Sequence, residues 1–333
     1  MVEVLYCLEY RFMRKTFASI HRHVDASAAY LPLRPAVVDA WPALEQVRPT
    51  SFSTDGTAEP LDDAVRAVDP DVIVANSRFR PDAITFPREY PFVHVRHGCS
   101  VGRDEVDNTT ADLDGSVDVA LAPGEYWAQR YREGFSSDVE TPVVGIPEAD
   151  DLVGTEPPGN RRILYAPTNH NYGGGSYLDT AEAVLDAVAG SRFELRFRPH
   201  PHDRTEEPGR SLTERCKQRI GRLPNVTFDE TPTPKESMLD ADLLLSDYSG
   251  IVTEWLHTGR PLVQLTTIAA ERTVPQLGYR TDHVSLDLLE SVYDAGYPAD
   301  VSRAVADSQV DLGIPMDGQA SVRAAQEVLA CTQ

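Results

Sequence analysis

The chain has 333 residues, a length that favours two domains over one small core. Its 31 Lys and Arg against 52 Asp and Glu give a net charge of -21, which argues against nucleic acid as a partner. A hydrophobic content of 41% is sufficient for packed cores, and no apolar run of about 18 residues predicts a transmembrane helix.

The charged-residue composition is more informative about the solvent in which the protein works than about its substrate. The chain has 28 Arg but only 3 Lys, and 30 Asp against 22 Glu. An Asp-rich, Lys-poor surface is typical of adaptation to high salt, where screening removes self-repulsion, so we predict a halophilic protein. The start has no basic leader followed by an apolar region, and four scattered cysteines (7, 99, 216 and 331) fit a reduced protein, so we predict a cytoplasmic location.

Residues 8–24 form a basic segment at the start of the acidic chain. Four cations surround five apolar residues at roughly i, i+4 spacing: Arg11, Arg14, Lys15 and Arg22 around Leu8, Phe12, Phe17, Ile20 and Val24. A basic amphipathic helix of this kind can rest on the inner face of the cell membrane as a peripheral contact. A first helix packed on a sheet, with Arg toward solvent, explains the same pattern.

Short apolar segments recur along the first half. We predict strands over residues 2–8, 71–76, 91–96, 117–122 and 141–145, and helices over residues 61–68 and 125–133. Strands that alternate with helices in this way predict βαβ units and a parallel sheet.

The pattern restarts after a Pro- and Gly-rich linker at residues 153–161. We predict strands over residues 162–166, 193–197, 225–228, 242–246 and 261–265, and helices over 177–189 and 319–331. The halves predict an α/β protein with two Rossmann-like domains, residues 1–152 and 162–333, whose parallel sheets face a central cleft. Ligands in such folds bind beyond the carboxyl ends of the strands.

The predicted strand at residues 242–246 leads directly into a polar, Gly-containing turn and a helix-compatible stretch. Such a turn can direct backbone N–H groups and the positive end of a helix toward a phosphate. We expect Ser249 to cap the helix and donate to the anion, Gly250 to permit close approach of a diphosphate, and Glu254 to reach a ribose one turn later. An ordinary strand-to-helix turn with a Ser cap remains the alternative.

Polar loops follow three other predicted strands: Arg96-His97-Gly98, then Thr168-Asn169-His170 with Gly173-Gly174-Gly175, and Arg198-Pro199-His200-Pro201-His202-Asp203. His97 is either a hydrogen-bonded structural histidine or a base, and Arg198 can neutralise a diphosphate. The three glycines lack a following GK[ST], so they predict a mobile loop and not a P-loop.

Other chemistries have weaker signals. His200 and His202 form an H-x-H pair, but in a Pro-rich loop, so we expect no metal site and no cofactor, with Mg²⁺ only as a diphosphate counterion. No G-x-S-x-G elbow and no cysteine motif supports nucleophilic acyl chemistry.

The run over residues 241–250, followed by Thr253-Glu254 and by residues 259–263, resembles the CDP-glycerol glycerophosphotransferases of teichoic-acid synthesis. Their hallmark is a strand that ends in S/T-D-Y-S-S, then a helix and a K-P strand. The supporting matches lie in order over more than half of the chain: His97-Gly98, Gly145-Ile146-Pro147 with Asp150, residues 163–168, and Arg198-Pro199-His200-Pro201.

The resemblance implies a two-domain GT-B fold whose C-terminal half binds a CDP-linked donor. The implied donor-binding residues are Thr168, Arg198, Asp247, Ser249, Gly250 and Glu254. His97 and His200 match the family's candidate acid/base histidines. The acceptor, which enters from the N-terminal half, would be a glycan, a polyol or a lipid-linked saccharide. Its hydroxyl would attack the β-phosphorus of the donor and release CMP.

The chain departs from the family pattern at four places: Gly250 replaces the second Ser, Arg103 is what remains of a Lys-rich stretch, Asn169-His170 replaces Trp-Arg, and Glu148 replaces an Arg. The Ser-Gly-then-Glu arrangement also resembles the hydrolysing UDP-N-acetylglucosamine 2-epimerases, which share the fold. An epimerase, a nucleotide-sugar glycosyltransferase and a nucleotide-binding module without turnover are therefore the alternatives.

Overall fold

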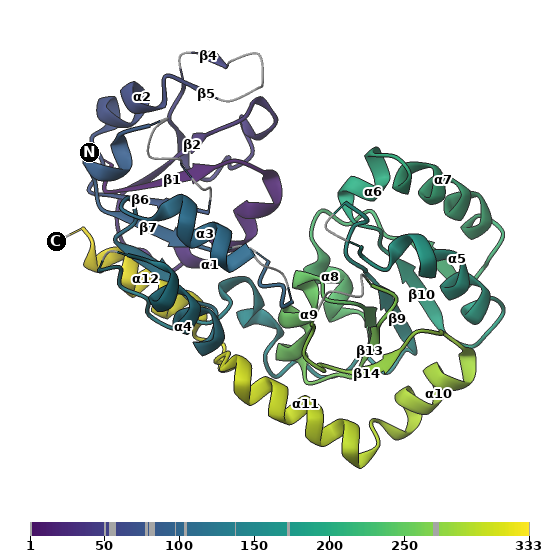
Figure 1. The fold of residues 1–333 in the computed structure, drawn as a ribbon. Coiled ribbons are helices and arrows are strands. Elements are labelled where there is room, and N and C mark those ends of the chain that lie inside the picture. The colour runs from purple at the N-terminus through teal and green to yellow at the C-terminus, as the bar shows by residue number, and fades with distance from the viewer. Residues whose placement is uncertain are drawn as a thin grey trace. The chain divides into compact units, whose positions relative to one another are not determined.

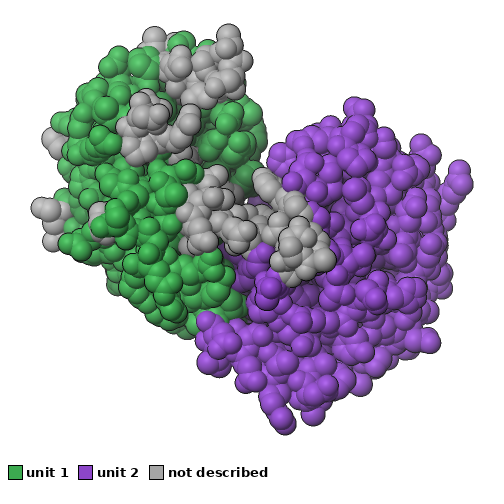
Figure 2. Space-filling view, in the orientation of Figure 1, with its two compact units in different colours: residues 1–97, 104–150, 312–333 green, residues 98–103, 151–311 purple. Residues whose placement is uncertain are grey.

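The computed structural model describes residues 2–49, 51–52, 58–76, 79, 84–96, 98–102, 105–136, 138–171, 174–268 and 273–332 (Figure 1). The chain divides into two compact units, coloured separately in Figure 2. The first contains Met1–His97, Asp104–Asp150 and Leu312–Gln333, and the second contains Gly98–Arg103 and Asp151–Asp311. Each unit is an α/β body with its own parallel sheet.

In the first unit, six parallel strands are found among the described residues, in the order β3-β2-β1-β6-β7-β8. Their bounds are β1 Val4–Leu8, β2 Ala28–Pro32, β3 Glu45–Gln46, β6 Val72–Ala75, β7 Phe92–Val95 and β8 Val119–Leu121. An antiparallel pair, β4 Ser51–Phe52 with β5 Ala58–Glu59, is separate from this sheet. The order is 3-2-1-4-5-6 in chain terms, which is that of dinucleotide-binding domains.

The helices of the first unit lie between these strands in the chain or follow the last of them. They are η1 Arg11–Met13, α1 Arg14–His21, η2 Pro35–Val37, α2 Leu61–Val68, η3 Phe86–Arg88, α3 Glu105–Leu113, α4 Glu125–Gly134 and α12 Ala320–Ala330, and η4 Pro147–Leu152 crosses the unit boundary. Strands β1 and β6 are short apolar runs that are buried along their length. This matches the near-continuous apolar character of strands covered on both faces.

The second unit repeats the strand order as β11-β10-β9-β12-β13-β14, again six parallel strands within the described part of the chain. The strands are β9 Arg162–Tyr165, β10 Glu194–Phe197, β11 Val226–Phe228, β12 Leu243–Ser246, β13 Leu262–Leu265 and β14 Tyr279–Thr281. The helices are α5 Tyr177–Val188, α6 Pro201–Thr205, α7 Gly209–Ile220, α8 Pro234–Leu239, α9 Gly250–Trp255, η5 Leu256–Thr258, α10 Leu286–Ala295 and α11 Ala299–Leu312. Apolar residues of α5, α7 and α10 pack on one face of this sheet.

Helix α1 places its apolar side in the core of the first unit. Leu8, Phe17 and Ile20 are fully buried, in a cluster shared with the sheet and with α12. The expectation that residues 8–24 present an apolar face to a membrane is therefore wrong for these three side chains, and the alternative of a helix packed on a sheet is observed. Tyr10 and Phe12, 39% and 45% exposed, are the aromatic residues of this segment that reach solvent.

The C-terminal helix α12 belongs to the first unit, although the predicted boundaries assigned residues 162–333 to the second domain. Its Ala324, Ala325 and Val328 complete the core against α1, beside which it lies in Figure 1. The Asp150 carboxylate accepts the backbone N–H groups of Ala320 and Ser321 at 3.0 and 2.7 Å. Because both are N–H groups at the start of α12, Asp150 satisfies donors that the helix itself cannot.

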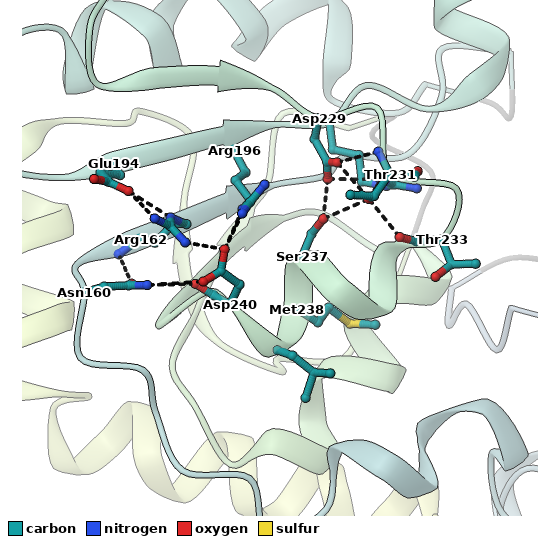
Figure 3. A network of polar contacts seen from close by, with 12 residues as sticks. Asn160, Arg162, Glu194, Arg196, Asp229, Thr231, Thr233, Ser237, Met238 and Asp240 are labelled. Atoms are coloured by element: carbon teal, nitrogen blue, oxygen red, sulfur yellow. Dashed lines mark hydrogen bonds and ion pairs between the residues drawn. The ribbon is translucent and has the colours of Figure 1, made fainter.

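A network of arginines ties the second sheet to α8 and the following turn. Figure 3 shows Arg162 of β9 and Arg196 of β10 converging on the Asp240 carboxylate, while Arg162 also pairs with Glu194. Burial on its own would raise the pKa of Asp240, but hydrogen bonds and charge from the two arginines lower it below its usual value. The chain thus uses Arg, and not Lys, where two strands share one carboxylate.

Most predicted strands are confirmed within one or two residues, but residues 141–145 do not form a named strand. Only isolated parallel bridges, Val119 with Glu140 and Ala122 with Val143, are found there. Pro142 has no N–H to donate to a ladder, which limits the pairing. No helix among the described residues is long and apolar enough to cross a membrane.

Candidate functional site

The loops after β9 and β12 diverge at the switch point of the second sheet. β9 lies between β10 and β12, so the chain leaves β9 toward one side and later returns on the other. In open parallel sheets, such a point forms a crevice beyond the carboxyl ends of the strands, where ligands bind. The first loop begins at Ala166 and the second at Asp247, so both predicted donor-binding segments lie here.

Asp247 fastens the two loops together. Its Oδ1 accepts the backbone N–H and the hydroxyl of Thr168 at 3.0 and 2.7 Å, and its Oδ2 accepts the same two groups of Ser176 at 3.0 and 2.8 Å. Asp247 and Thr168 are each 1% exposed. Both predicted donor-binding residues therefore point into the protein, and they shape the crevice without facing it.

The turn after β12 also uses the Asp247 carboxylate. The backbone N–H groups of Tyr248 and Ser249 donate to Oδ1 at 2.6 and 3.1 Å. These two amides face the protein's own carboxylate, whereas the sequence led us to expect them to face a phosphate. Ser249 occupies the N-cap position of α9, and its hydroxyl makes no capping hydrogen bond to the helix.

Gly250 begins α9 against another segment of the same unit. A Cβ at this position would lie 2.9 Å from Gly98 Cα, closer than real Cβ contacts allow, and 3.1 Å from Gly98 C. The close approach that requires glycine is thus made by the backbone at Gly98. His97, the chain neighbour of Gly98, lies outside the described residues.

Glu254 lies within α9, as the sequence predicted, but it is only 3% exposed. The flanking Thr253 and Trp255 are fully buried, and the Trp255 indole N–H donates to the carbonyls of Arg260 and Pro261 at 3.1 Å. The helix that carries Glu254 is therefore held firmly against the start of β13.

Arg198 is bonded to the loop after β11. Its Nη1 donates to Asp229 Oδ2 at 3.0 Å and to the carbonyl and hydroxyl of Thr231 at 3.0 and 2.7 Å. Figure 3 shows how Ser237 and Thr231 converge on Asp229. Burial would raise the pKa of Asp229, but these hydrogen bonds and the Arg198 charge bring it below its usual value. Asp229 thus already balances the positive charge predicted to meet a diphosphate.

His200 occupies the N-cap position of α6, at the end of the loop after β10. Its Nδ1 accepts the backbone N–H of His202 at 3.2 Å, and the two imidazole rings stack with centroids 5.3 Å apart. The His202 ring pairs with Glu206. Across the described part of the chain, no group of three or more His, Cys, Asp and Glu is arranged to hold a metal ion.

The structure gives contacts to two residues, Asn169 and His170, that the sequence placed in a polar loop without assigning them a role. Asn169 is fully buried, with its side-chain nitrogen 3.3 Å from His200 Nδ1. His170 pairs through Nδ1 with the buried Asp203 of α6, and its Nε2 lies 3.2 Å from the Glu207 carbonyl. Burial raises the pKa of Asp203, and its hydrogen bonds with His170 oppose that shift. In the sequence, the replacement of the family's Trp-Arg pair by Asn169-His170 was the signal that these two positions differ in their contacts.

The glycine-rich segment is packed at its end, from Gly175 onward. A Cβ on Gly175 would lie 2.5 Å from the Thr168 carbonyl oxygen, and the next residue, Ser176, is fully buried on Asp247. Gly175 and Ser176 thus form part of the site's framework, whereas Gly174 is exposed and Gly173 lies outside the described residues, so the mobility of this loop stays a prediction.

A family model matches residues 64–267 of the chain, and its description is CDP-glycerol:poly(glycerophosphate) glycerophosphotransferase. The match includes the loops after β9, β10 and β12 and the position of His97. No curated protein sequence matches the chain.

Solved structures share the fold at low identity. The wall teichoic acid polymerase TagF is 14% identical with a TM-score of 0.65, over 99% of this chain and 88% of its own. One structure of a TagF variant comes from a soak with CDPG. A putative UDP-N-acetylglucosamine 2-epimerase from Listeria monocytogenes is 14% identical with a TM-score of 0.67, over 97% of this chain and 94% of its own. The Neisseria meningitidis UDP-GlcNAc 2-epimerase bound to UDP-GlcNAc has 14% identity and a TM-score of 0.63, over 99% of this chain and 100% of its own. The fold is GT-B-like, as predicted.

Proposed function

Because the chain belongs to the CDP-glycerol:poly(glycerophosphate) glycerophosphotransferase family, we propose that it transfers glycerol phosphate, or a related polyol phosphate, from a CDP-linked donor to an acceptor hydroxyl. The observation that carries this proposal is the family match across residues 64–267, which spans the crevice loops of the second unit. The acceptor would be a glycan, a polyol or a lipid-linked saccharide, and it would bind on the side of the first unit.

The proposed step forms one P–O bond and breaks another. The acceptor oxygen attacks the β-phosphorus of the donor, the bond from that phosphorus to the oxygen bridging to CMP breaks, and CMP leaves with the bonding electron pair. The hydroxyl proton passes to a base, for which His97 is the candidate. His200 is the second candidate catalytic histidine, at the start of α6.

The donor-binding residues divide into two groups in this proposal. Ser249 and Gly250 lie at the turn after β12 and would meet the diphosphate directly, whereas Glu254, only 3% exposed within α9, would act on the ribose indirectly. Thr168, Asp247 and Arg198 act indirectly, because each is bonded to a neighbouring loop. Mg²⁺ would enter only with the diphosphate, as its counterion.

The first test is thermal melting with CDP-glycerol, CDP, UDP-N-acetylglucosamine and UDP in parallel. A ligand at about 100 times its Kd should stabilise the protein by about 2.7 kcal/mol, a shift of a few degrees. Stabilisation by the cytidine ligands alone supports the proposal. Stabilisation by the uridine ligands favours an epimerase or a nucleotide-sugar glycosyltransferase.

The second test is CMP release from CDP-glycerol with and without an acceptor. We expect release that depends on the acceptor and is lost in His97→Ala and in His200→Ala, but retained in His283→Ala, which removes an exposed histidine. Cytidine binding without turnover in the wild-type protein would instead identify a non-catalytic nucleotide-binding module. Full turnover in both single variants would remove the catalytic assignment.

We also propose that the acidic surface reflects a high-salt environment. The net charge of -21 comes from 52 Asp and Glu against 31 Lys and Arg, and salt screens the mutual repulsion of these carboxylates. The melting temperature should rise between low and molar KCl. An unchanged melting temperature across that range would contradict the halophilic assignment.

A further inference from the structure

The hydrogen bonds around His200 determine which ring nitrogen holds its proton. A neutral imidazole has one N–H, and the other nitrogen is an acceptor. His200 Nδ1 lies 3.2 Å from the backbone N–H of His202, which can only donate. A proton on Nδ1 would face that N–H directly, so neutral His200 holds its proton on Nε2.

Asn169 adds a second donor at the same nitrogen. Its Oδ1 accepts the backbone N–H of Asn171 at 2.8 Å, which fixes the orientation of the side-chain amide. The NH₂ group therefore faces His200 Nδ1, at 3.3 Å. Asn169 is fully buried, so a flip of its side-chain amide would break these contacts and leave buried polar groups unsatisfied.

Carboxylates hold the loop on both sides of Asn169. Thr168 is bonded to Asp247, and His170 is bonded to Asp203 through both its ring and its backbone N–H. The next residue, Asn171, donates to Glu206. Because Asp203 lies within the short helix that His200 caps and Glu206 directly follows it, hydrogen bonds join the loop after β9 to α6.

We propose that Asn169 is a positioning residue, which together with the His202 backbone amide holds His200 as the Nε2–H tautomer. If the proposed glycerophosphotransferase function is correct, on which the following assignment rests, His200 is a hydrogen-bond donor to the transferred phosphoryl group and does not take the acceptor's proton. The base role then falls to His97. A donor placed where negative charge increases in the transition state lowers the barrier without a proton transfer of its own.

The side chain at position 169 makes two hydrogen-bond contacts that a side chain without an amide cannot make. The notable feature is an amide that can both accept from Asn171 and donate to His200, in place of the tryptophan of the family pattern. A side chain lacking either group would remove the Asn169 contact at His200 Nδ1, where the His202 backbone amide also donates.

The test measures the tautomer directly, by long-range ¹H–¹⁵N correlation spectra of the full chain. Protonated and unprotonated ring nitrogens have separate chemical shifts, and His200→Gln identifies the His200 signals by their loss. Above the pH at which histidines are charged, we expect Nδ1 of wild-type His200 to be unprotonated and Nε2 to be protonated. Protonation at Nδ1 in the wild-type protein would overturn the proposal.

Variants at position 169 supply the second part of the test. Asn169→Asp places an acceptor beside Nδ1 and should move ring proton density to that nitrogen, and kcat for CMP release should fall about 10- to 100-fold with a smaller change in KM. Asn225→Ala is the matched control, because it removes a partly buried asparagine that bonds to Val188 and Phe193 in the same unit. It should leave the His200 spectrum unchanged.

The two readouts separate this proposal from the proposed function. An Nε2–H tautomer that shifts in Asn169→Asp, in a protein that releases no CMP from CDP-glycerol, upholds the positioning role and removes the reaction. Normal turnover with an unshifted tautomer in Asn169→Asp upholds the reaction and removes the positioning role.

Discussion

Asp247 and Thr168, 79 residues apart in the chain, are joined by two hydrogen bonds to one carboxylate oxygen, from the Thr168 backbone at 3.0 Å and from its hydroxyl at 2.7 Å. The same carboxylate accepts two more from Ser176. The geometry of the candidate site therefore depends on a residue that is itself buried.

Asp247→Ala should destabilise the protein by about 3 kcal/mol or more, because several buried donors lose their acceptor. Urea unfolding monitored by circular dichroism measures the loss. The control is Asp179→Ala, which removes an exposed aspartate from the first turn of α5 and should cost no more than about 1 kcal/mol. Equal stability of the two variants would contradict the anchoring role of Asp247.

Gly250→Ala should lower stability by about 1–3 kcal/mol, since the new Cβ would meet backbone atoms of Gly98 and not a flexible side chain. Thermal unfolding without ligand measures this effect separately from donor binding. Gly221→Ala is the matched control, because its helical φ of -59° suits alanine and the nearest atoms lie 3.7 Å away. If Gly250→Ala melts like the wild type and only weakens nucleotide binding, the close contact with Gly98 is not what requires glycine.

Ser237→Ala should reduce stability at neutral pH and have a progressively smaller effect toward acid. The Ser237 hydroxyl donates to Asp229, whose folded pKa is lowered, so this contribution is complete above the unfolded pKa of about 3.9 and is lost as pH falls through the folded value. Denaturant unfolding at a series of pH values measures the difference. Ser116→Ala, which removes a buried hydroxyl bonded to the Leu113 carbonyl, should show a difference that does not vary with pH. A pH-independent effect of Ser237→Ala would contradict the linkage.

Phe17→Ala should destabilise the protein by about 3–5 kcal/mol, because Phe17 is fully buried in the core beneath α1. Phe12→Ala, five residues earlier and 45% exposed, should change stability by about 1 kcal/mol or less. Chemical unfolding and vesicle co-sedimentation are measured on both variants. Weaker vesicle binding by Phe17→Ala at unchanged stability would show that this apolar side serves a membrane and not the core.

The sequence alone determined the parts of the protein that depend on local pattern. Continuous apolar runs predicted strands such as β6, β9 and β12, because strands buried on both faces need apolar residues at successive positions. Their alternation with helices predicted the parallel sheets, and the motif residues predicted the family. Strands with mixed polarity, such as the half-exposed β14 and the two-residue β3, were not predicted, because their pairing depends on a neighbour already being in place.

Tertiary structure decided which partners the predicted residues have. The sequence placed Asp247, Thr168 and Arg198 in the correct loops but directed them toward a ligand, whereas each is bonded to another loop. The sequence likewise predicted α12 as an amphipathic helix, but it did not predict that this helix packs beside α1. A residue's pattern indicates that it will be buried or bonded, but the identity of a partner 79 or 170 residues away is set by how the strands cross and where their ends meet.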